Sequence, residues 1–293
     1  MDDFGACRTA SSALTFGSNC EMLGDAASSS RDCHREMMSA FPYGSPDLPS
    51  WEDAARDIEV MLTSLGLQSI RRYLGQHHWE KESQSALAAD EAEPGLKLEN
   101  VAAHSWQVAD ATMLLAPTFP EINPQRALEL AIVHDKLELF TGDFDPVGSD
   151  GQGTYSHAFN GRAQTHKTAL ELAALERYVA QLRGPARDLQ RSLILETIRA
   201  SSAEALFVKA VDKLQALSFV LVKKAGQMTD EHLAFSLRYS AKAVDYFPQL
   251  RVHHAVLCSR LVTGIANVRH VRVEEVLEAI PPALRALATP DEQ

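Results

Sequence analysis

Four side chains between positions 134 and 143 are of types that bind metal ions or exchange protons: His134, Asp135, Glu138 and Asp143. The surrounding segment begins with Asn123-Pro124, a typical helix start, and stays apolar on nearly all sides up to Gly142. A charged group inside a protein is costly unless it is paired or coordinates a metal ion. We therefore interpret residues 123–142 as a buried helix that carries part of a metal site.

His104 is a candidate third ligand. It lies on the apolar stripe of a helix that Asn100 is expected to cap, one turn before Val108. A lone histidine in such a position is commonly a core residue that is hydrogen-bonded within the protein. Its combination with a His-Asp doublet and a later acidic residue favours the metal-site interpretation.

Asp212 is that later acidic residue. It lies beside apolar side chains on the expected buried face of a helix that Ser201 or Ser202 caps. An ion pair with Lys209 or Lys213 is the alternative explanation. With Asp212 included, two imidazoles and two carboxylates form a mixed set of nitrogen and oxygen donors. Such a set suits one divalent transition-metal ion (Mn, Co, Fe, Ni or Zn) and leaves positions open for further ligands such as water.

Glu138 is the candidate acid-base residue. It lies one helical turn beyond His134 on the same face, where it could orient a water molecule or exchange a proton with it. The alternative is an ordinary helix residue that forms an ion pair with Lys136 or Arg126.

The elements that must position these residues are all predicted to be helices. Apolar residues recur at helical spacing, and no segment shows the sustained alternation that is typical of strands. We predict an all-α protein with helices over 51–65, 67–79, 100–115, 123–142, 160–182, 186–200, 202–217, 230–247, 250–268 and 273–287. Three parts are expected: an N-terminal arm or lid over 1–50, a central domain over 51–228 and a C-terminal helical extension over 229–293 that packs on the same core.

Composition limits the possible partners. Of 293 residues, 45% are hydrophobic and 23% charged, as in ordinary globular proteins. The chain has no apolar run of about 18 residues and no secretory signal, so we expect no membrane partner. Four cysteines without a C-x-x-C pair favour a reducing, cytoplasmic location. A net charge of −11 without a Lys/Arg block argues against duplex nucleic acid as a partner.

Four segments resemble the motifs of the HD-domain metal-dependent phosphohydrolases, and most closely those of their 5′-deoxynucleotidase-like branch. They are Leu67-Gln-Ser-Ile-Arg-Arg72-Tyr73, Glu99-Asn-Val-Ala-Ala-His-Ser-Trp106, His134-Asp-x-x-Glu138-x-x-x-Gly142-Asp143 and Ser202-Ala-Glu-Ala-x-Phe-Val-Lys-Ala-Val-Asp212. A His-Asp dipeptide alone is weak evidence, whereas these four segments in order are specific. The resemblance covers roughly residues 60–225.

The resemblance implies an all-α enzyme that binds one divalent metal ion through the four donors named above. The implied reaction is release of phosphate from a nucleotide, foremost a deoxynucleoside 5′-monophosphate or an analogue. In this family pattern Glu138 acts on the attacking water and Asp143 contacts the sugar hydroxyls. Arg72, Tyr73 and Trp106 are implied to contact the nucleotide, and we expect a homodimer.

Lys167 and Arg162 are further candidates to face the phosphate, with a solvent-exposed helix face as the alternative. Two features depart from the branch pattern. Ala103 replaces an acidic residue before the first histidine, so a hydrogen-bond partner for that histidine must come from elsewhere. The stretch over 73–99 is also longer than usual, and we expect a polar surface loop or insertion over 80–96.

Three alternative functions remain for the same residues. A di-iron oxygenase on the HD scaffold would need two more histidines after the doublet, and His157 and His166 lie there. The others are a nucleotide triphosphohydrolase of specialised metabolism and a non-catalytic HD binding module. Against the oxygenase, His157 lies in a Gly-rich loop, and the Gly142-Asp143 and Ser202–Asp212 segments match the nucleotidase branch. Against the non-catalytic module, Glu138 and all four donors are present.

Overall fold

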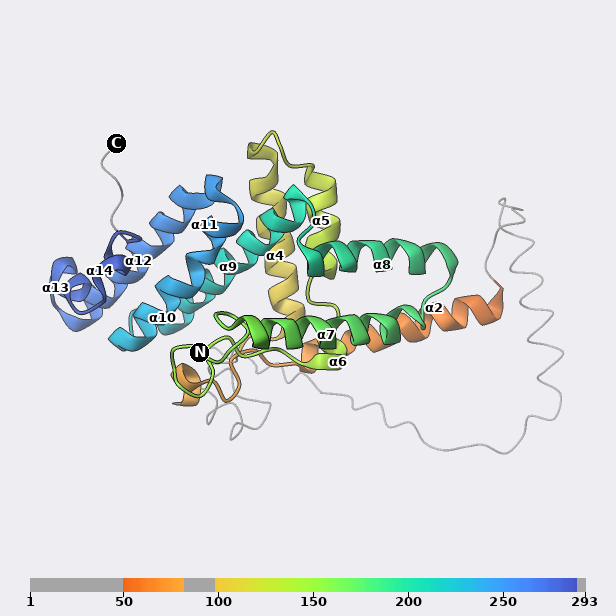
Figure 1. Ribbon diagram of the computed structural model, residues 1–293, viewed down its shortest axis with the longest axis horizontal. Helices are drawn as coiled ribbons and strands as arrows, with labels where there is room; N and C mark the ends of the chain where they lie inside the picture. The colour runs from red at the N-terminus through yellow and green to blue at the C-terminus, as the bar shows by residue number, and fades with distance from the viewer. Residues whose placement is uncertain (1–49, 82–97, 289–293) are drawn as a thin grey trace, which may run out of the picture. The chain divides into compact units, whose positions relative to one another are not determined.

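The computed structural model describes residues 50–81 and 98–288, which belong to one compact unit. The predicted arm over 1–50 lies outside the described residues except for Ser50, and so does most of the loop predicted over 80–96. Within the described residues every regular element is a helix, which confirms the all-α prediction (Figure 1).

The α-helices follow one another with short connections. They are α2 (Trp51–Ser64), α4 (Val101–Leu115), α5 (Pro124–Val133), α6 (Glu138–Thr141), α7 (Gly161–Val179), α8 (Gly184–Arg199), α9 (Ala203–Lys224), α10 (Asp230–Ser240), α11 (Lys242–Tyr246), α12 (Arg251–Arg269), α13 (Val273–Glu278) and α14 (Pro282–Arg285). The short 3-10 helices are η1 (Leu65–Ser69), η2 (His77–Trp79), η3 (Ala116–Thr118) and η4 (Pro248–Leu250). None of the helices in these described ranges is long and apolar enough to cross a lipid bilayer.

Polar side chains start the helices that carry the candidate ligands. The side chain of Asn100 accepts a hydrogen bond from the backbone N–H of Ala103 (2.9 Å), and Ser202 Oγ accepts one from Ala205 (3.0 Å). Ser50, Asn123 and Asn160 cap α2, α5 and α7 in the same way. Because such a cap typically contributes about 1 kcal/mol, these helix starts are determined locally, as the sequence predicted.

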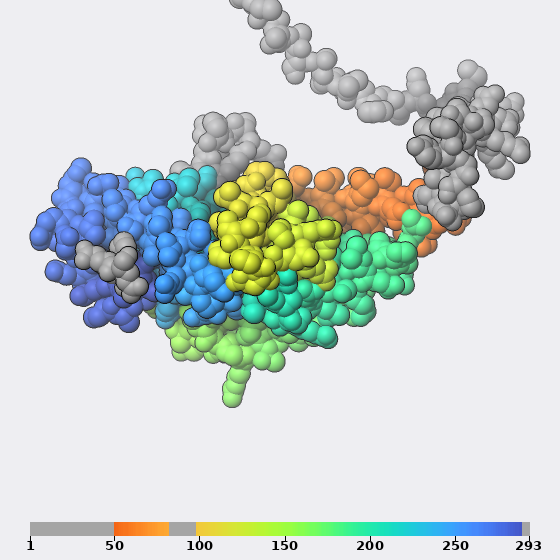
Figure 2. Space-filling view, turned by 90° about the horizontal axis from the view of Figure 1, so that it is seen from above, coloured from red at the N-terminus to blue at the C-terminus, as the bar shows by residue number. Residues whose placement is uncertain are grey.

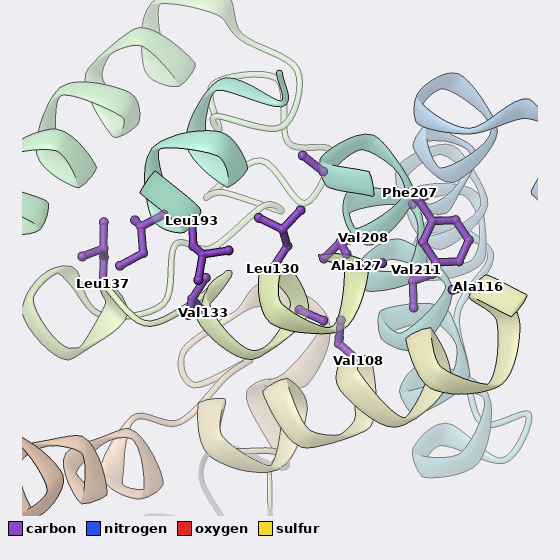
Figure 3. Close-up of a cluster of buried hydrophobic side chains, with 14 of the residues drawn as sticks. Val108, Ala116, Ala127, Leu130, Val133, Leu137, Leu193, Phe207, Val208 and Val211 are labelled. Atoms are coloured by element: carbon purple, nitrogen blue, oxygen red, sulfur yellow. The ribbon is translucent and has the colours of Figure 1, made fainter. Parts of the chain in front are cut away.

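Helix α9 is the central element of the described unit, and it packs against α4, α5, α8, α10, α11 and α12. Figure 3 shows its Val208 facing Leu130 of α5 and Val108 of α4 within the main apolar cluster. Phe207 of α9 is fully buried in the same cluster. This packing holds α4, α5 and α9 together, and those are the helices from which the candidate metal ligands project.

A second apolar cluster joins the C-terminal helices to the later part of α9. Leu217 and Val220 of α9 pack there with Leu233 of α10 and Leu261 of α12. In Figure 2 the blue helices α12 and α13 lie at the opposite end of the described unit from the orange helix α2. The domain boundary expected near residue 228 therefore falls between elements that share this cluster, and it stays a prediction.

The helix predicted over 123–142 is interrupted at its functional centre. Helix α5 ends at Val133, and α6 begins only at Glu138. Between them the backbone N–H groups of Lys136 and Glu138 bond to the carbonyls three residues earlier, Val133 and Asp135 (both 3.1 Å). Hydrogen bonds of this shorter span close a tight turn instead of a regular helix, so the His-Asp doublet lies in a turn.

The prediction of one continuous helix over 67–79 is wrong. The chain forms η1, then an irregular stretch with an isolated β-bridge between Arg71 and Asn100, and then η2. Tyr73 and Gly75 have positive φ angles (66° and 73°), which a right-handed helix cannot accommodate. The later predictions need smaller corrections: α7 ends at Val179 instead of 182, and the helix predicted over 230–247 is divided into α10 and α11.

Candidate active site

The four candidate metal ligands come together from three elements. His104 projects from α4, the His134-Asp135 doublet lies in the turn after α5, and Asp212 projects from α9. His134 Nε2 lies 3.3 Å from His104 Nε2 and 3.1 Å from Asp135 Oδ2. His104 Nε2 in turn lies 3.3 Å from Asp135 Oδ2 and 3.1 Å from Asp212 Oδ1. Residues more than 100 positions apart therefore present nitrogen and oxygen donors to one point.

Hydrogen bonds on the far side of each imidazole decide which nitrogen faces this point. His134 Nδ1 lies 2.7 Å from the carbonyl oxygen of Ala131, which can only accept, so this nitrogen carries the proton. His104 Nδ1 lies 2.7 Å from Gln215 Oε1 and is assigned as a donor for the same reason. Both Nε2 atoms can then direct a lone pair toward the carboxylate oxygens, as metal-binding histidines do.

The donor spacing fits a divalent metal ion. Metal–ligand bonds of about 2.1 Å hold neighbouring donors about 3.0 Å apart at right angles and about 3.4 Å apart at tetrahedral angles. The four distances between donor atoms, 3.1 to 3.3 Å, lie in this range. His104, His134 and Asp135 form a group in which every donor lies within 4.8 Å of the others, and Asp212 adjoins that group at His104.

The carboxylates of this group require a nearby positive charge. Burial alone would raise the pKa of Asp135, but the adjacent His134 and His104 hold it well below its ordinary value. Burial acts likewise on Asp212, whose pKa is held low by Lys213 and His104. Burial and Arg72 lower the pKa of His104, yet its hydrogen bonds to the two carboxylates raise it to about 9. A proton or a metal cation can supply this positive charge.

Gln215 supplies the hydrogen-bond partner that Ala103 cannot provide for His104. Its Nε2 donates to Glu99 Oε1 (2.7 Å) and Gln107 Oε1 (2.6 Å), so its oxygen faces the imidazole. The sequence analysis missed Gln215. Its spacing from Asp212 could have indicated this role, because a residue three positions after Asp212 lies on the same face of α9.

Replacement of Gln215 by leucine is expected to weaken metal binding on the order of 10–100-fold, because His104 loses the acceptor that orients its ring. Titration with a competing chelator would measure this change. Gln125→Leu, which alters an exposed glutamine of α5, is the matched control. Equal metal affinities for the two variants would show that Gln215 does not position His104.

A cavity of about 80 Å³ opens beside these ligands. Its polar lining includes Arg72, Tyr73, Asp135, Glu138, Asp143, Lys167 and Asp212. Trp79, Leu217, Val220 and Phe235 supply much of its apolar lining. A cavity that combines several polar and charged groups with apolar side chains can hold a small molecule that has both polar and apolar parts. Phe235 shows that α10, from the predicted C-terminal extension, forms part of this wall.

Glu138 is buried in this cavity, and its Oε2 has no hydrogen-bond partner in the described part of the chain. The ion pairs considered for it are not formed, since Lys136 donates to Ser64 and Arg126 pairs with Glu129 and Glu196. Burial raises the pKa of Glu138 well above its ordinary value, and the nearby carboxylates of Asp135 and Asp143 raise it further. A buried carboxyl group with a raised pKa and an oxygen that has no partner is suited to proton transfer.

Arg72 reaches this cavity despite the long stretch that follows it. Its Nη1 donates to Glu99 Oε2 (2.9 Å), and its Nε lies 3.7 Å from Asp143 Oδ1. Burial raises the pKa of Asp143, although Arg72 opposes this shift. Tyr73 lines the same cavity and stacks on Phe219, with ring centroids 5.1 Å apart.

Two of the predicted substrate contacts are placed elsewhere on the surface. Trp106 is 68% exposed and lines neither of the two cavities beside the ligands. Two positions correspond to roughly 200° around a helix, so Trp106 points away from the side of α4 that carries His104. Arg162 is exposed as well. Lys167, by contrast, is half-buried and lines both cavities.

The second cavity, of about 140 Å³, lies beside the same ligands. It shares Asp135, Asp212 and His157 with the first cavity and is also lined by lysines from α7, α9 and α11. Burial, and after it the charges of the neighbouring lysines, lower the pKa of His157 to about 3, so this side chain is neutral. His166, the other histidine considered for a di-iron site, is exposed and lines neither cavity.

Comparison with known proteins shows similarity to one family. A family model described as HD domain matches residues 88–251. The chain is 32% identical over 126 residues to the 5′-deoxynucleotidase hdd1 of Schizosaccharomyces pombe, a match that covers 42% of this chain and 57% of that protein. It is 27% identical over 173 residues to a 5′-deoxynucleotidase of Cronobacter sakazakii, with 54% and 80% covered. The chain thus spans little more than half the length of the first relative.

A crystal structure of a protein described as a predicted metal-dependent phosphohydrolase from Magnetospirillum magnetotacticum is also similar to this chain. The superposition has a TM-score of 0.43 with 19% sequence identity, and it covers 81% of this chain and 99% of that one.

Proposed function

This chain belongs to the HD-domain family, whose model matches residues 88–251, and we therefore propose that it is a metal-dependent phosphohydrolase of nucleotides. The proposed substrate is foremost a deoxynucleoside 5′-monophosphate or an analogue. One observation carries the proposal: four donor atoms, spaced by 3.1 to 3.3 Å, adjoin a cavity lined by Glu138, whose Oε2 has no hydrogen-bond partner among the described residues. Similarity to proteins named 5′-deoxynucleotidases supports the substrate class.

His104, His134, Asp135 and Asp212 are the proposed ligands of one divalent ion. Bound there, the ion would polarise a phosphoryl oxygen and lower the pKa of a water molecule. The mixture of imidazole and carboxylate donors supports Mn, Co, Fe, Ni or Zn over Mg or Ca, which prefer oxygen donors alone.

Glu138 is proposed to move the proton. Its buried position beside Asp135 and Asp143 favours the protonated carboxyl group. A protonated carboxyl group can donate to the 5′-oxygen as the nucleoside leaves, and the resulting carboxylate can take a proton from the next water molecule. Its unpartnered Oε2 leaves this group available for both transfers.

Arg72, Tyr73 and Asp143 are proposed to bind the nucleotide. The hydrogen bond from Arg72 to Glu99 orients the guanidinium group and leaves further N–H donors for phosphate oxygens. Asp143 can accept hydrogen bonds from sugar hydroxyls at the same end of the cavity. Lys167 is proposed as an additional phosphate contact, because it is half-buried and lines both cavities.

A phosphate-release assay over nucleotides and metals tests this function. We expect release from deoxynucleoside 5′-monophosphates with at least one of Mn, Co, Fe, Ni or Zn, and slower release from the matching 3′-monophosphates. No release from any nucleotide with any of these metals would refute the proposal. Two bound iron atoms per chain, together with consumption of oxygen, would favour the HD-scaffold oxygenase instead.

We further propose that the protein forms a homodimer and is located in the cytoplasm. No residue of α2 is buried, and its Ile58, Met61 and Leu62 are about half exposed or more. Neighbouring apolar side chains exposed on one helix are typical of an interaction surface, which supports association through α2. The sparse cysteines support a reducing compartment.

A further inference from the structure

Two adjacent histidines and a glutamate meet away from the candidate active site. His77 and His78 belong to η2, and Glu231 lies in the first turn of α10, more than 150 positions later in the sequence. Each residue offers one donor atom, and these three atoms lie within 4.8 Å of one another. None of the three residues lines either of the two cavities described above. We call them the His-His-Glu cluster.

The spacing within this cluster fits two donors that share one ion. His77 Nε2 lies 3.7 Å from Glu231 Oε2, which is too long for a hydrogen bond. Two ligands held about 2.1 Å from one ion lie about 3.4 Å apart at tetrahedral angles, and slightly further apart when the angle opens. A small movement of either side chain would therefore place both donors on one ion.

The two imidazole rings of the cluster are arranged like those of the candidate active site. The ring centroids of His77 and His78 are 5.1 Å apart, with an interplanar angle of 69°. The corresponding values for His104 and His134 are 5.3 Å and 60°. Both pairs are thus separated and tilted as two imidazoles are when they approach a common point from different sides.

Hydrogen bonds from the loop before α7 orient two of the three donors. His78 Nε2 lies 2.9 Å from the carbonyl oxygen of Gly151, which can only accept, so this nitrogen carries the proton and Nδ1 has the lone pair. Gln152 Nε2 donates to Glu231 Oε1 (3.2 Å), and the other carboxylate oxygen faces His77. Partners of this kind fix the tautomer and direction of metal ligands.

Gly151 lets the loop backbone lie directly against the cluster. Its φ angle is +68°, and a Cβ at this position would lie 2.6 Å from Glu231 Oε1 and 2.9 Å from His77 Cδ2. Glycine alone among the residue types accepts both this backbone conformation and this close approach. The loop therefore holds the side chains of η2 and α10 beside each other.

We propose that the His-His-Glu cluster is a second metal site, which binds a zinc ion. Two imidazoles and one carboxylate are a donor set that suits Zn²⁺, with water in the remaining position. The side chains of His77 and Glu231 are 44% and 42% exposed, so this ion exchanges readily with the solvent. It is bound more weakly than an ion held by four ligands and is lost on purification without added zinc. The proposal does not depend on the reaction at the candidate active site.

An ion at this position would fasten two segments of the wall of the first cavity. Trp79 follows His78 in η2, His232 follows Glu231 in α10, and both Trp79 and His232 line that cavity. The rings of His78 and His232 are stacked, with centroids 4.5 Å apart. Zinc would therefore stabilise the contact between η2 and α10.

Calorimetric titration with zinc chloride tests the site in the full-length His134→Ala protein, whose four-donor set is incomplete. We expect this protein to bind zinc. Adding either His77→Ala or Glu231→Gln should weaken that binding at least about tenfold, because each change removes one of three ligands. Adding His166→Ala, which removes an exposed histidine of α7, is the matched control and should leave the zinc affinity unchanged.

Thermal unfolding gives a second readout that does not depend on turnover. Zinc at about 100 times its Kd should raise the Tm of the His134→Ala protein by roughly 5–10 °C, since the ion binds only the folded chain. Most of this shift should disappear when Glu231→Gln is added. Circular dichroism without zinc shows whether each variant is folded before the titration.

Three results would overturn the proposal. Failure of the His134→Ala protein to bind zinc would leave His77 and Glu231 as a surface ion pair. Equal zinc affinities with and without His77→Ala would place the ion elsewhere. Weakening by His77→Ala but not by Glu231→Gln would exclude the link between η2 and α10. None of these results would affect the proposed phosphohydrolase function, which the phosphate-release assay tests separately.

Discussion

Replacement of His134 by alanine is expected to abolish tight metal binding and phosphate release together. Its Nε2 belongs to the donor group, 3.1 Å from Asp135 Oδ2 and 3.3 Å from His104 Nε2. The proposed ion has four protein ligands, so the loss of one leaves an incomplete set and also removes an imidazole whose orientation the Ala131 carbonyl determines. Metal content by mass spectrometry and kcat in the same preparation measure both effects.

His166→Ala is the matched control for this variant, because it removes an exposed histidine of α7 that lines neither cavity. It should retain full metal content and activity. Asp212→Ala is expected to behave like His134→Ala. A metal-replete, active His134→Ala protein with an unchanged circular dichroism spectrum would contradict the proposed ligand set.

Replacement of Glu138 by glutamine is expected to lower kcat on the order of 10²–10⁴-fold, the usual cost of losing a positioned acid-base group. Glutamine retains the size and the hydrogen-bonding capacity of glutamic acid but cannot transfer a proton. Because Glu138 is not one of the proposed ligands, metal content should remain at the wild-type level, and KM should change little. Steady-state kinetics of the metal-replete variant measure the change.

Glu129→Gln provides the comparison, since Glu129 is a half-buried α5 residue paired with Arg126 and lines neither cavity. Loss of such a pair costs at most about 1 kcal/mol of stability and should leave kcat unchanged. Near wild-type turnover by the Glu138→Gln protein would show that another group moves the proton.

The sequence by itself determined the helical class, most helix starts and the family. Caps such as Asn100, Asn123 and Ser202 act within a few residues of the backbone groups that they satisfy, so their effect can be predicted from local sequence. The resemblance to the HD domain is confirmed by the family model. The same local reasoning failed over 67–79, where positive φ angles at Tyr73 and Gly75 prevent the predicted helix.

The tertiary structure alone decided how the site is assembled. A continuous helix would separate the side chains of His134 and Asp135 by roughly 100°, and the turn after α5 instead brings their donor atoms to 3.1 Å. Gln215 accepts a hydrogen bond from His104, although the two residues are 111 positions apart in the sequence. This contact depends on the packing of α9 against α4.

The second cavity beside the ligands is also assembled only by the tertiary structure. Lys167, Lys209 and Lys242 occupy three different helices, and no spacing rule relates them. Periodicity describes the face of one helix, whereas neighbours on different helices are determined by how apolar faces pack. For that reason the sequence indicated the types of groups that could act on a phosphate, while the packing around α9 decided which of them adjoin the same cavity.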